Sequence, residues 1–151
     1  MKVQKMNNND FCISVIGAGS WGTALALLLS DKGYRVNLWD IDGPHIEKLK
    51  EDRENKRHLP GAQFSDSLSL TKDIVHAVSG CQVIVMVVPS HGFRSVLSKI
   101  VDIAPIGAVF VSATKGIENE SMLTMTQIVD EHIQKSKRKN ELEVAVLSGP
   151  S

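Results

Sequence analysis

Residues 11–29, FCISVIGAGSWGTALALLL, constrain the fold more than any other part of the chain. Residues 11–16 form a short, mostly apolar run that predicts a buried strand. Residues 17–22 follow directly and fit the pattern G-x-G-x-x-G, and residues 23–29 are strong helix formers. A strand, a glycine turn and a helix in direct succession predict the first half of a dinucleotide-binding βαβ unit.

Each glycine of this turn has its own physical task. Gly17 permits the tight turn off the strand, and Gly19 lets a pyrophosphate approach the backbone because it has no Cβ. Gly22 allows the helix to pack close to the sheet. The free N–H groups and the positive dipole end of the helix then face the phosphates. We therefore favour a nucleotide site over a merely structural tight turn.

The rest of the chain alternates between strand and helix patterns. Strands are expected at 35–40, 68–70, 83–88, 108–113 and 143–147, and helices at 45–54, 71–78, 93–101 and 121–134. The run 83–88 is the most apolar and predicts a central strand that is buried on both faces. Met122 and Met125 lie at helical spacing and are expected in the core. These patterns predict an α/β fold: a Rossmann-type, doubly wound, mostly parallel sheet with helices on both faces.

Asp40 ends the second expected strand, 23 positions after Gly17. The acid that binds the coenzyme ribose in such folds lies roughly 20 residues after the glycine turn, so Asp40 is a candidate acceptor for the adenine-ribose hydroxyls. The alternatives are a solvated loop carboxylate or a cap for the next helix. Asp42 competes for the cap, because it precedes a helix that is entered through Pro44.

Two loops that follow apolar strands are expected at the carboxyl edge of the sheet, where ligands bind. The first loop begins at Pro89 and Ser90, after the strand at 83–88. The second contains Lys115, for which we favour the ligand crevice over solvent. The cationic residues 56–58 are consistent with a phosphate contact or with a solvated surface.

Charge and composition exclude several classes of function. The formal net charge is +0 and the pI is about 7.0, which does not indicate binding to nucleic acid or an anionic membrane. No apolar run approaches the roughly 20 residues of a membrane span, and residues 1–10 have no secretory signal pattern and are expected to form a disordered tail. A cytoplasmic location is expected, with Cys12 and Cys81 as reduced core thiols near neighbouring strand starts. The scattered His and Cys residues do not have metal-ligand spacing.

Residues 17–26 resemble the coenzyme loop of bacterial NAD(P)-dependent glycerol-3-phosphate dehydrogenases. Four further segments occur in the order and spacing of that family: LPG at 59–61, VPSH at 88–91, SATKGIE at 112–118 and SGPS at 148–151. The resemblance covers nearly the whole chain after the tail, but only the N-terminal half of a typical member. It implies that residues 11–151 are the dinucleotide-binding domain of a longer enzyme, without its helical substrate domain.

The resemblance also implies a site. Ser20 and Trp21 would contact NAD or NADP, Lys115 would reach the nicotinamide and the substrate in a catalytic role, and Gly149 and Ser151 would border the substrate. The candidate coenzyme-binding residues are Gly17, Gly19, Ser20, Trp21, Gly22, Asp40, Ile41, His58, Pro89, Ser90 and Lys115. The proton-transferring lysine of the family would lie beyond residue 151.

Two departures from the family pattern bear on the coenzyme. His58 stands where a tyrosine is common before Leu-Pro-Gly, so the aromatic stacking contact changes. Ile41 follows Asp40 where the family often has a basic or polar residue that helps hold a 2′-phosphate. These differences and the charge of Asp40 favour NAD over NADP.

The activity implied by the resemblance is reduction of dihydroxyacetone phosphate to sn-glycerol 3-phosphate for phospholipid synthesis, with a homodimer as the full-length form. One alternative is another dehydrogenase, of the 6-phosphogluconate or ketopantoate type. The segments 113–116 and 148–151 argue against it. The other alternative is a stand-alone NAD(H)-binding sensor without catalysis.

Overall fold

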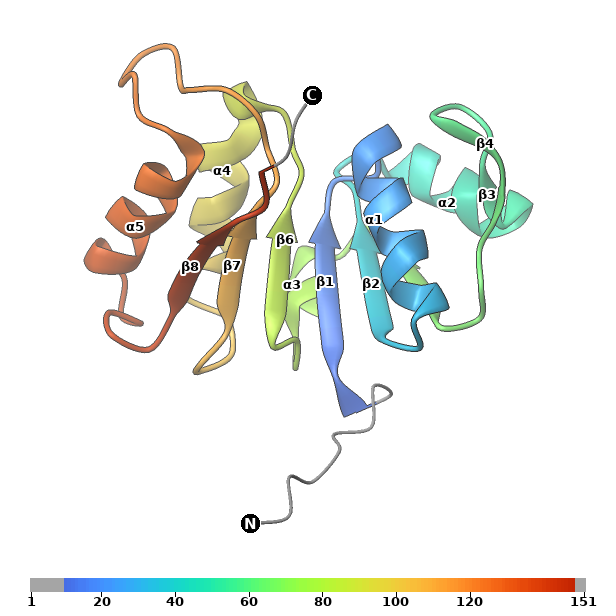
Figure 1. Ribbon diagram of the computed structural model, residues 1–151, viewed down its shortest axis with the longest axis horizontal. Helices are drawn as coiled ribbons and strands as arrows, with labels where there is room; N and C mark the ends of the chain where they lie inside the picture. Colours follow the sequence, from blue (N-terminus) through green and yellow to red (C-terminus); the bar gives the residue numbers. More distant parts are fainter. Residues whose placement is uncertain (1–9, 149–151) are drawn as a thin grey trace.

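Six parallel strands form the central sheet, in the order β5-β2-β1-β6-β7-β8 (Figure 1). The computed structural model describes residues 10–148. The strands are β1 Cys12–Ile16, β2 Arg35–Trp39, β5 Leu68–Thr71, β6 Val83–Met86, β7 Val109–Ser112 and β8 Glu143–Val146. The chain winds outwards from β1 in one direction and then from β6 in the other. This is the doubly wound Rossmann arrangement, so the predicted fold class is confirmed.

Helices lie on both faces of the sheet. They are α1 Ser20–Asp31, α2 Gly43–Asp52, α3 Ile74–Val78, α4 Ser90–Ile100 and α5 Met125–Lys135. Side chains alternate along a strand, so Val15 of β1 packs in the cluster beneath α1 and α2, and Ile16 packs with α3, α4 and α5. Because these strands are parallel, the loops after β1, β6 and β7 meet at one edge of the sheet, the upper edge in Figure 1.

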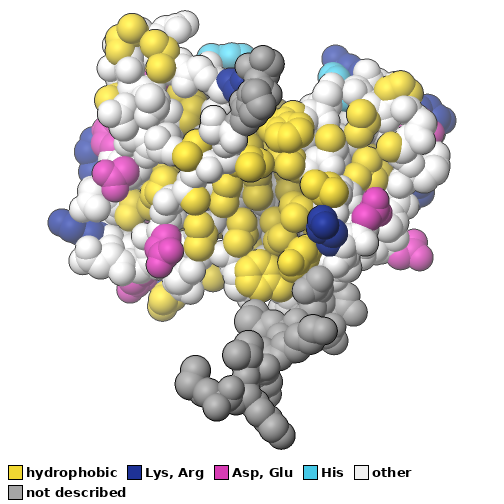
Figure 2. Space-filling model, viewed as in Figure 1, with side chains coloured by type: hydrophobic (Ala, Val, Ile, Leu, Met, Phe, Trp, Pro, Cys, Tyr) yellow, Lys and Arg dark blue, Asp and Glu magenta, His cyan; other side chains and the backbone are white. Residues whose placement is uncertain are grey.

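One face of the sheet is only partly covered. The helices on the side of Val15, α1 and α2, contact β1, β2 and β5. The same face carries Val83 of β6, Val87 just after β6 and Val111 of β7, which are only partly buried. Figure 2 shows hydrophobic side chains gathered over the middle of this face. The prediction that residues 83–88 are buried on both faces is therefore correct only for part of that strand.

A small antiparallel pair was not predicted. It consists of β3 Glu54–Asn55 and β4 Leu59–Gln63 and follows α2, which ends at Arg53 in a left-handed conformation. The carboxylate of Glu54 accepts hydrogen bonds from the Gly61 N–H at 2.7 Å and from Gln63 Nε2 at 2.9 Å. The segment lacks the apolar alternation that indicates a strand.

The last helix begins later than predicted. It starts at Met125 because Thr124 and Gln127 form a capping box, in which each side chain bonds to the backbone of the other. The loop before it is closed by a bridge between Ile117 and Thr124. The prediction that Met125 is in the core is confirmed, but the prediction for Met122 is wrong. Met122 lies in that loop with a positive φ and is 66% exposed.

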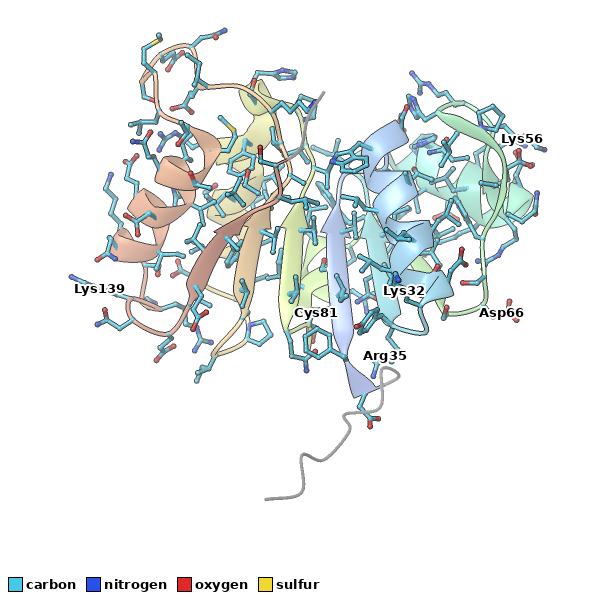
Figure 3. All side chains as sticks on the ribbon, in the orientation of Figure 1. Lys32, Arg35, Lys56, Asp66, Cys81 and Lys139 are labelled. Carbon is cyan, nitrogen blue, oxygen red and sulfur yellow. The ribbon has the colours of Figure 1, made fainter. Side chains whose placement is uncertain are left out.

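Both cysteines are buried free thiols, as predicted. The Asn37 amide nitrogen lies 3.7 Å from the Cys12 sulfur and 3.5 Å from the Cys81 sulfur, and it donates to the Ala77 carbonyl at 3.1 Å. The interaction between the two thiols lowers the pKa of Cys12 to about 7 and, together with burial, raises the pKa of Cys81. Figure 3 places Cys81 at the lower end of the sheet, away from the carboxyl edge.

Within residues 10–148, none of the helices combines the length and the apolar character that crossing a bilayer requires. The predicted tail lies almost wholly in residues 1–9, outside the described residues.

Candidate functional site

A cavity of about 1570 Å³ follows the carboxyl edge of the sheet and brings the candidate residues together. Its lining includes every candidate in the described part of the chain: Gly17, Gly19, Ser20, Trp21, Gly22, Asp40, Ile41, His58, Pro89, Ser90 and Lys115. Gly149 and Ser151 lie outside the described residues. The lining runs from the loop after β2, past the glycine turn, to the loops after β6, β7 and β8, so it spans the switch point between β1 and β6.

The three glycines of the turn are required for different reasons. Gly17 has a φ of 118°, and a Cβ there would lie 2.7 Å from the Val87 carbonyl oxygen. A Cβ on Gly22 would lie 1.9 Å from the carbonyl oxygen of Gly17, so this glycine fits the helix against the turn rather than mainly against the sheet. A Cβ on Gly19 would meet nothing within 4 Å. Gly19 therefore opens directly to the cavity.

Helix α1 presents its N-terminus to the cavity. It begins at Ser20, three residues before the predicted start, and no side chain caps it. The Thr23 N–H donates to the Gly19 carbonyl at 2.9 Å, and Ser20 and Trp21 are exposed on the first turn. Backbone N–H groups at such a helix end, together with the helix dipole, favour a bound anion.

Ala18, inside the turn, is held at both of its backbone polar groups. Its N–H donates to Asp40 Oδ2 at 2.8 Å. Its carbonyl oxygen accepts from Asn55 Nδ2 at 3.0 Å and from the Thr23 hydroxyl at 3.3 Å. Three side chains therefore fix the turn: Asp40 after β2, Asn55 in β3 and Thr23 in α1.

The structure assigns Asp40 a contact that the sequence did not reveal. Its second oxygen, Oδ1, accepts from the Asp42 N–H at 2.9 Å, so the carboxylate joins the glycine turn to the loop after β2. Asp40 is therefore not simply solvated and is not the helix cap. Asp42 is the N-cap of α2, and its side chain accepts from the His45 N–H at 3.1 Å.

The loop at 55–58 forms one end of the cavity. Arg57 and His58 line it, and the His58 ring meets the His45 ring edge to face, with centroids 5.4 Å apart. Ile41 lies at the same end and is 72% exposed. Asn55 and His45 were not predicted as site residues, because a single Asn after a helix and a His in a polar helix are ordinary surface residues.

At the other end of the cavity lie the loops after β6 and β7. Pro89 is the N-cap of α4 and Ser90 is its first residue. The hydroxyl of Thr114 donates to the Val88 carbonyl at 2.8 Å and to the Met86 carbonyl at 3.2 Å, which ties the two loops together. Lys115 follows directly, exposed and on the cavity lining.

Ion pairs of Arg94 hold the loop that carries Lys115. Arg94 of α4 donates from Nε and Nη2 to the two carboxylate oxygens of Glu118, each at 2.8 Å, and its Nη1 reaches Glu131 of α5 at 3.3 Å. The hydroxyl of Ser121 also donates to Glu118. Arg94 and Ser121 together lower the pKa of Glu118 to about 2, from an ordinary value of 4.5.

Lowering the pH should weaken the Arg94–Glu118 ion pair over a defined pH range. A carboxyl whose pKa is lowered on folding stabilises the fold above its unfolded pKa, and this stabilisation is lost as the pH falls from about 4.5 to about 2. We expect Arg94→Met to lower the unfolding temperature by a few degrees at pH 6 and by progressively less as the pH falls through that range. Circular dichroism melts of both chains from pH 7 to pH 2.5 measure this difference. Lys99→Met, which removes an exposed lysine from the last turn of α4, is the control. If the difference in unfolding temperature between wild type and Arg94→Met stayed constant across this pH range, the role given to Glu118 would be removed.

Comparison with known proteins identifies the family. The family described as "NAD-dependent glycerol-3-phosphate dehydrogenase N-terminus" matches residues 12–151. A glycerol-3-phosphate dehydrogenase [NAD(P)+] of Desulfotalea psychrophila is 45% identical over 146 residues, which are 97% of this chain and 43% of the relative. The corresponding protein of Bacillus velezensis is 39% identical over 139 residues, which are 92% of this chain and 39% of the relative.

A solved structure supports the same relationship. The crystal structure of glycerol-3-phosphate dehydrogenase from Coxiella burnetii has a TM-score of 0.82 and 33% sequence identity, and the match covers 93% of this chain and 41% of that one. The chain thus spans about two fifths of the length of these relatives. It belongs to the NAD-dependent glycerol-3-phosphate dehydrogenase family and corresponds to the family's N-terminal region.

Proposed function

We propose that this chain binds a nicotinamide dinucleotide along the cavity at the carboxyl edge of its sheet. The pyrophosphate would lie against Gly19 and the first turn of α1, where backbone N–H groups favour an anion. The adenosine would extend towards Asp40, Ile41 and His58, and the nicotinamide towards Pro89 and Ser90. The observation that carries this proposal is Gly19, whose missing side chain opens to the cavity although neither of the other two glycines does.

The proposed reaction belongs to the longer protein of which the relatives are examples. It is reduction of dihydroxyacetone phosphate to sn-glycerol 3-phosphate, which supplies phospholipid synthesis. A bound nicotinamide coenzyme supplies the hydride. The Lys115 ammonium would offset charge on the substrate phosphate or on the developing alkoxide. Gly149 and Ser151 would border the substrate, and the proton-transferring lysine would lie in a second, helical domain, as the family resemblance implies.

NAD(H) is the proposed preferred coenzyme. The Asp40 carboxylate is held by the backbone N–H groups of Ala18 and Asp42, so it is not free to swing away from a 2′-phosphate. A phosphate placed next to it would meet a fixed negative charge. Arg57 lines the same end of the cavity and would partly offset this repulsion. We therefore expect a modest preference rather than exclusion of NADP(H).

Two further proposals rest on the family resemblance, namely a homodimer for the full-length protein and a cytoplasmic location. The relatives reported above are named as glycerol-3-phosphate dehydrogenases. The names of these relatives do not favour the two alternatives, which are a dehydrogenase of the 6-phosphogluconate or ketopantoate type and a sensor without catalysis.

Coenzyme titration and a turnover assay test the proposal. The 151-residue chain should quench or shift NADH fluorescence on binding, with a lower Kd for NADH than for NADPH. It should show no oxidation of NADH with dihydroxyacetone phosphate, because the proposed proton donor is not among these residues. A protein that carries this domain at the relatives' full length should consume NADH and form sn-glycerol 3-phosphate. An absence of NADH binding would contradict the proposed coenzyme site. Turnover by residues 1–151 alone would contradict the proposal that a second domain supplies the proton-transferring lysine.

A further inference from the structure

Asn55 is a buried amide that uses both of its ends at the glycine turn and its neighbouring loop. It is 0% exposed. Its Nδ2 donates to the Ala18 carbonyl at 3.0 Å and to the Thr23 hydroxyl at 2.8 Å. Its Oδ1 accepts from the His58 N–H at 3.1 Å. A buried amide with all of these partners satisfied is held in one orientation, and it holds its partners in turn.

The contact with Ala18 bears directly on the proposed pyrophosphate position. The Ala18 carbonyl belongs to the same planar peptide unit as the Gly19 N–H, and in a trans peptide these two groups point in opposite directions. Asn55 and Thr23 hold the carbonyl towards the buried interior. The Gly19 N–H is therefore turned away from the interior, on the side where Gly19 opens to the cavity.

The contact with His58 connects the turn to the far end of the cavity. The backbone N–H of His58 is held by the same side chain that holds Ala18, and Arg57 and His58 both line the proposed adenosine end. The amide thus fixes the spacing between the place proposed for the pyrophosphate and the place proposed for the adenosine.

We propose that Asn55 is a positioning residue for the coenzyme, one that holds the glycine turn and the 55–58 loop ready for binding without touching the ligand itself. This inference rests on the coenzyme-binding function proposed above. Asn55→Ala removes all of the side chain's hydrogen bonds. Asn55→Asp keeps an acceptor for the His58 N–H but places a carboxylate oxygen against the Ala18 carbonyl. Both changes should weaken binding, although Asn55 itself is not among the residues that line the cavity.

A matched control comes from the chain itself. Asn37 is a partly buried amide that donates to the Ala77 carbonyl at 3.1 Å beneath α3, and its contacts lie with the two thiols rather than with the cavity. Asn37→Ala should therefore destabilise the fold without changing the affinity for NADH. A merely structural role for Asn55 would give the same result as Asn37→Ala.

The experiment measures the Kd and the stoichiometry of NADH and of ADP for wild type and the variants, at a temperature where circular dichroism shows all of them folded. For Asn55→Ala we expect a rise in Kd of about ten- to a hundredfold for both ligands, since the hydrogen bonds to Ala18 and Thr23 are lost, whereas the His58 N–H keeps the backbone carbonyl of residue 55 at 3.2 Å. A less stable fold alone would lower the stoichiometry and leave Kd unchanged. Thr23→Val, which keeps the volume and removes the hydroxyl, should raise Kd about threefold to tenfold and provides the test if Asn55→Ala does not fold.

The outcomes separate the two proposals. If wild type binds NADH and the Asn55 and Thr23 variants bind it within twofold of wild type, the positioning role is overturned and the coenzyme site stands. If wild type does not bind NADH, the proposed function fails and this inference fails with it. If Asn37→Ala raises the Kd as much as Asn55→Ala does, the effect comes from general destabilisation and the positioning role is again overturned.

Discussion

NADH binding is expected to be lost in Gly19→Val while the unfolding temperature stays near that of wild type. Gly19 has φ −72° and ψ −173°, an extended conformation that valine adopts without strain. A Cβ at this position meets nothing within 4 Å. The isopropyl group would instead occupy the space proposed for the pyrophosphate, and we expect Kd to rise by more than about a hundredfold, roughly 3 kcal/mol of binding free energy.

Gly22→Ala is the contrasting variant. Its added methyl would lie 1.9 Å from the carbonyl oxygen of Gly17, which is backbone and cannot move aside cheaply. This variant should lose thermal stability together with binding. Fluorescence titration with NADH and a circular dichroism melt on the two variants separate a blocked site from a broken turn. Equal affinity of Gly19→Val and wild type would remove the glycine turn from the coenzyme site.

Lys115→Ala should lower turnover strongly in a protein that carries this domain at the relatives' full length. Lys115 is exposed on the cavity lining, in the loop after β7 that Thr114 and Glu118 anchor. Removing an electrostatic group that acts on developing charge costs roughly 10²- to 10³-fold in kcat. The Kd for NADH should change little, because the proposed contact is with the substrate and the nicotinamide end rather than with the pyrophosphate.

Initial rates with dihydroxyacetone phosphate and a separate NADH titration measure these two quantities. Lys99→Ala, an exposed lysine in the last turn of α4 and outside the cavity lining, controls for loss of surface charge. A solvated lysine with no role would leave kcat and Kd near wild type after either substitution. A fully active Lys115→Ala enzyme would therefore remove the role proposed for this side chain.

Local patterns in the sequence were sufficient to predict the fold, because each strand, turn and helix is specified by residues that are close together in the chain. The strand, glycine turn and helix at 11–29 predicted the switch region, and the apolar runs predicted the other strands. Where a boundary depends on one hydrogen bond, the pattern failed. The helical spacing of Met122 continues smoothly into α5, but the capping box at Thr124 and Gln127 starts the helix at Met125.

The contacts that fix the site were less accessible to sequence analysis. Asp40 and Asp42 are both acids near the end of β2, and only their geometry shows that the first holds Ala18 and the second caps α2. Asn55 lies 37 residues from Ala18, on a hairpin whose residues carry no strand pattern. Interactions at such separation depend on how the elements pack, and no local spacing encodes them.

The partly covered face of the sheet has a consequence for the thermodynamics of this chain in isolation. Val83, Val87 and Val111 keep part of their surface in water when the chain is folded, so that surface is not newly hydrated on unfolding. The heat-capacity increment of unfolding follows the apolar area that becomes exposed, at about 12–15 cal/mol/K per residue in ordinary domains. The increment per residue is therefore smaller for this chain, and the denaturant dependence of its stability is shallower for the same reason. Its stability curve is accordingly flatter with temperature than that of a domain of equal length whose sheet is covered on both sides.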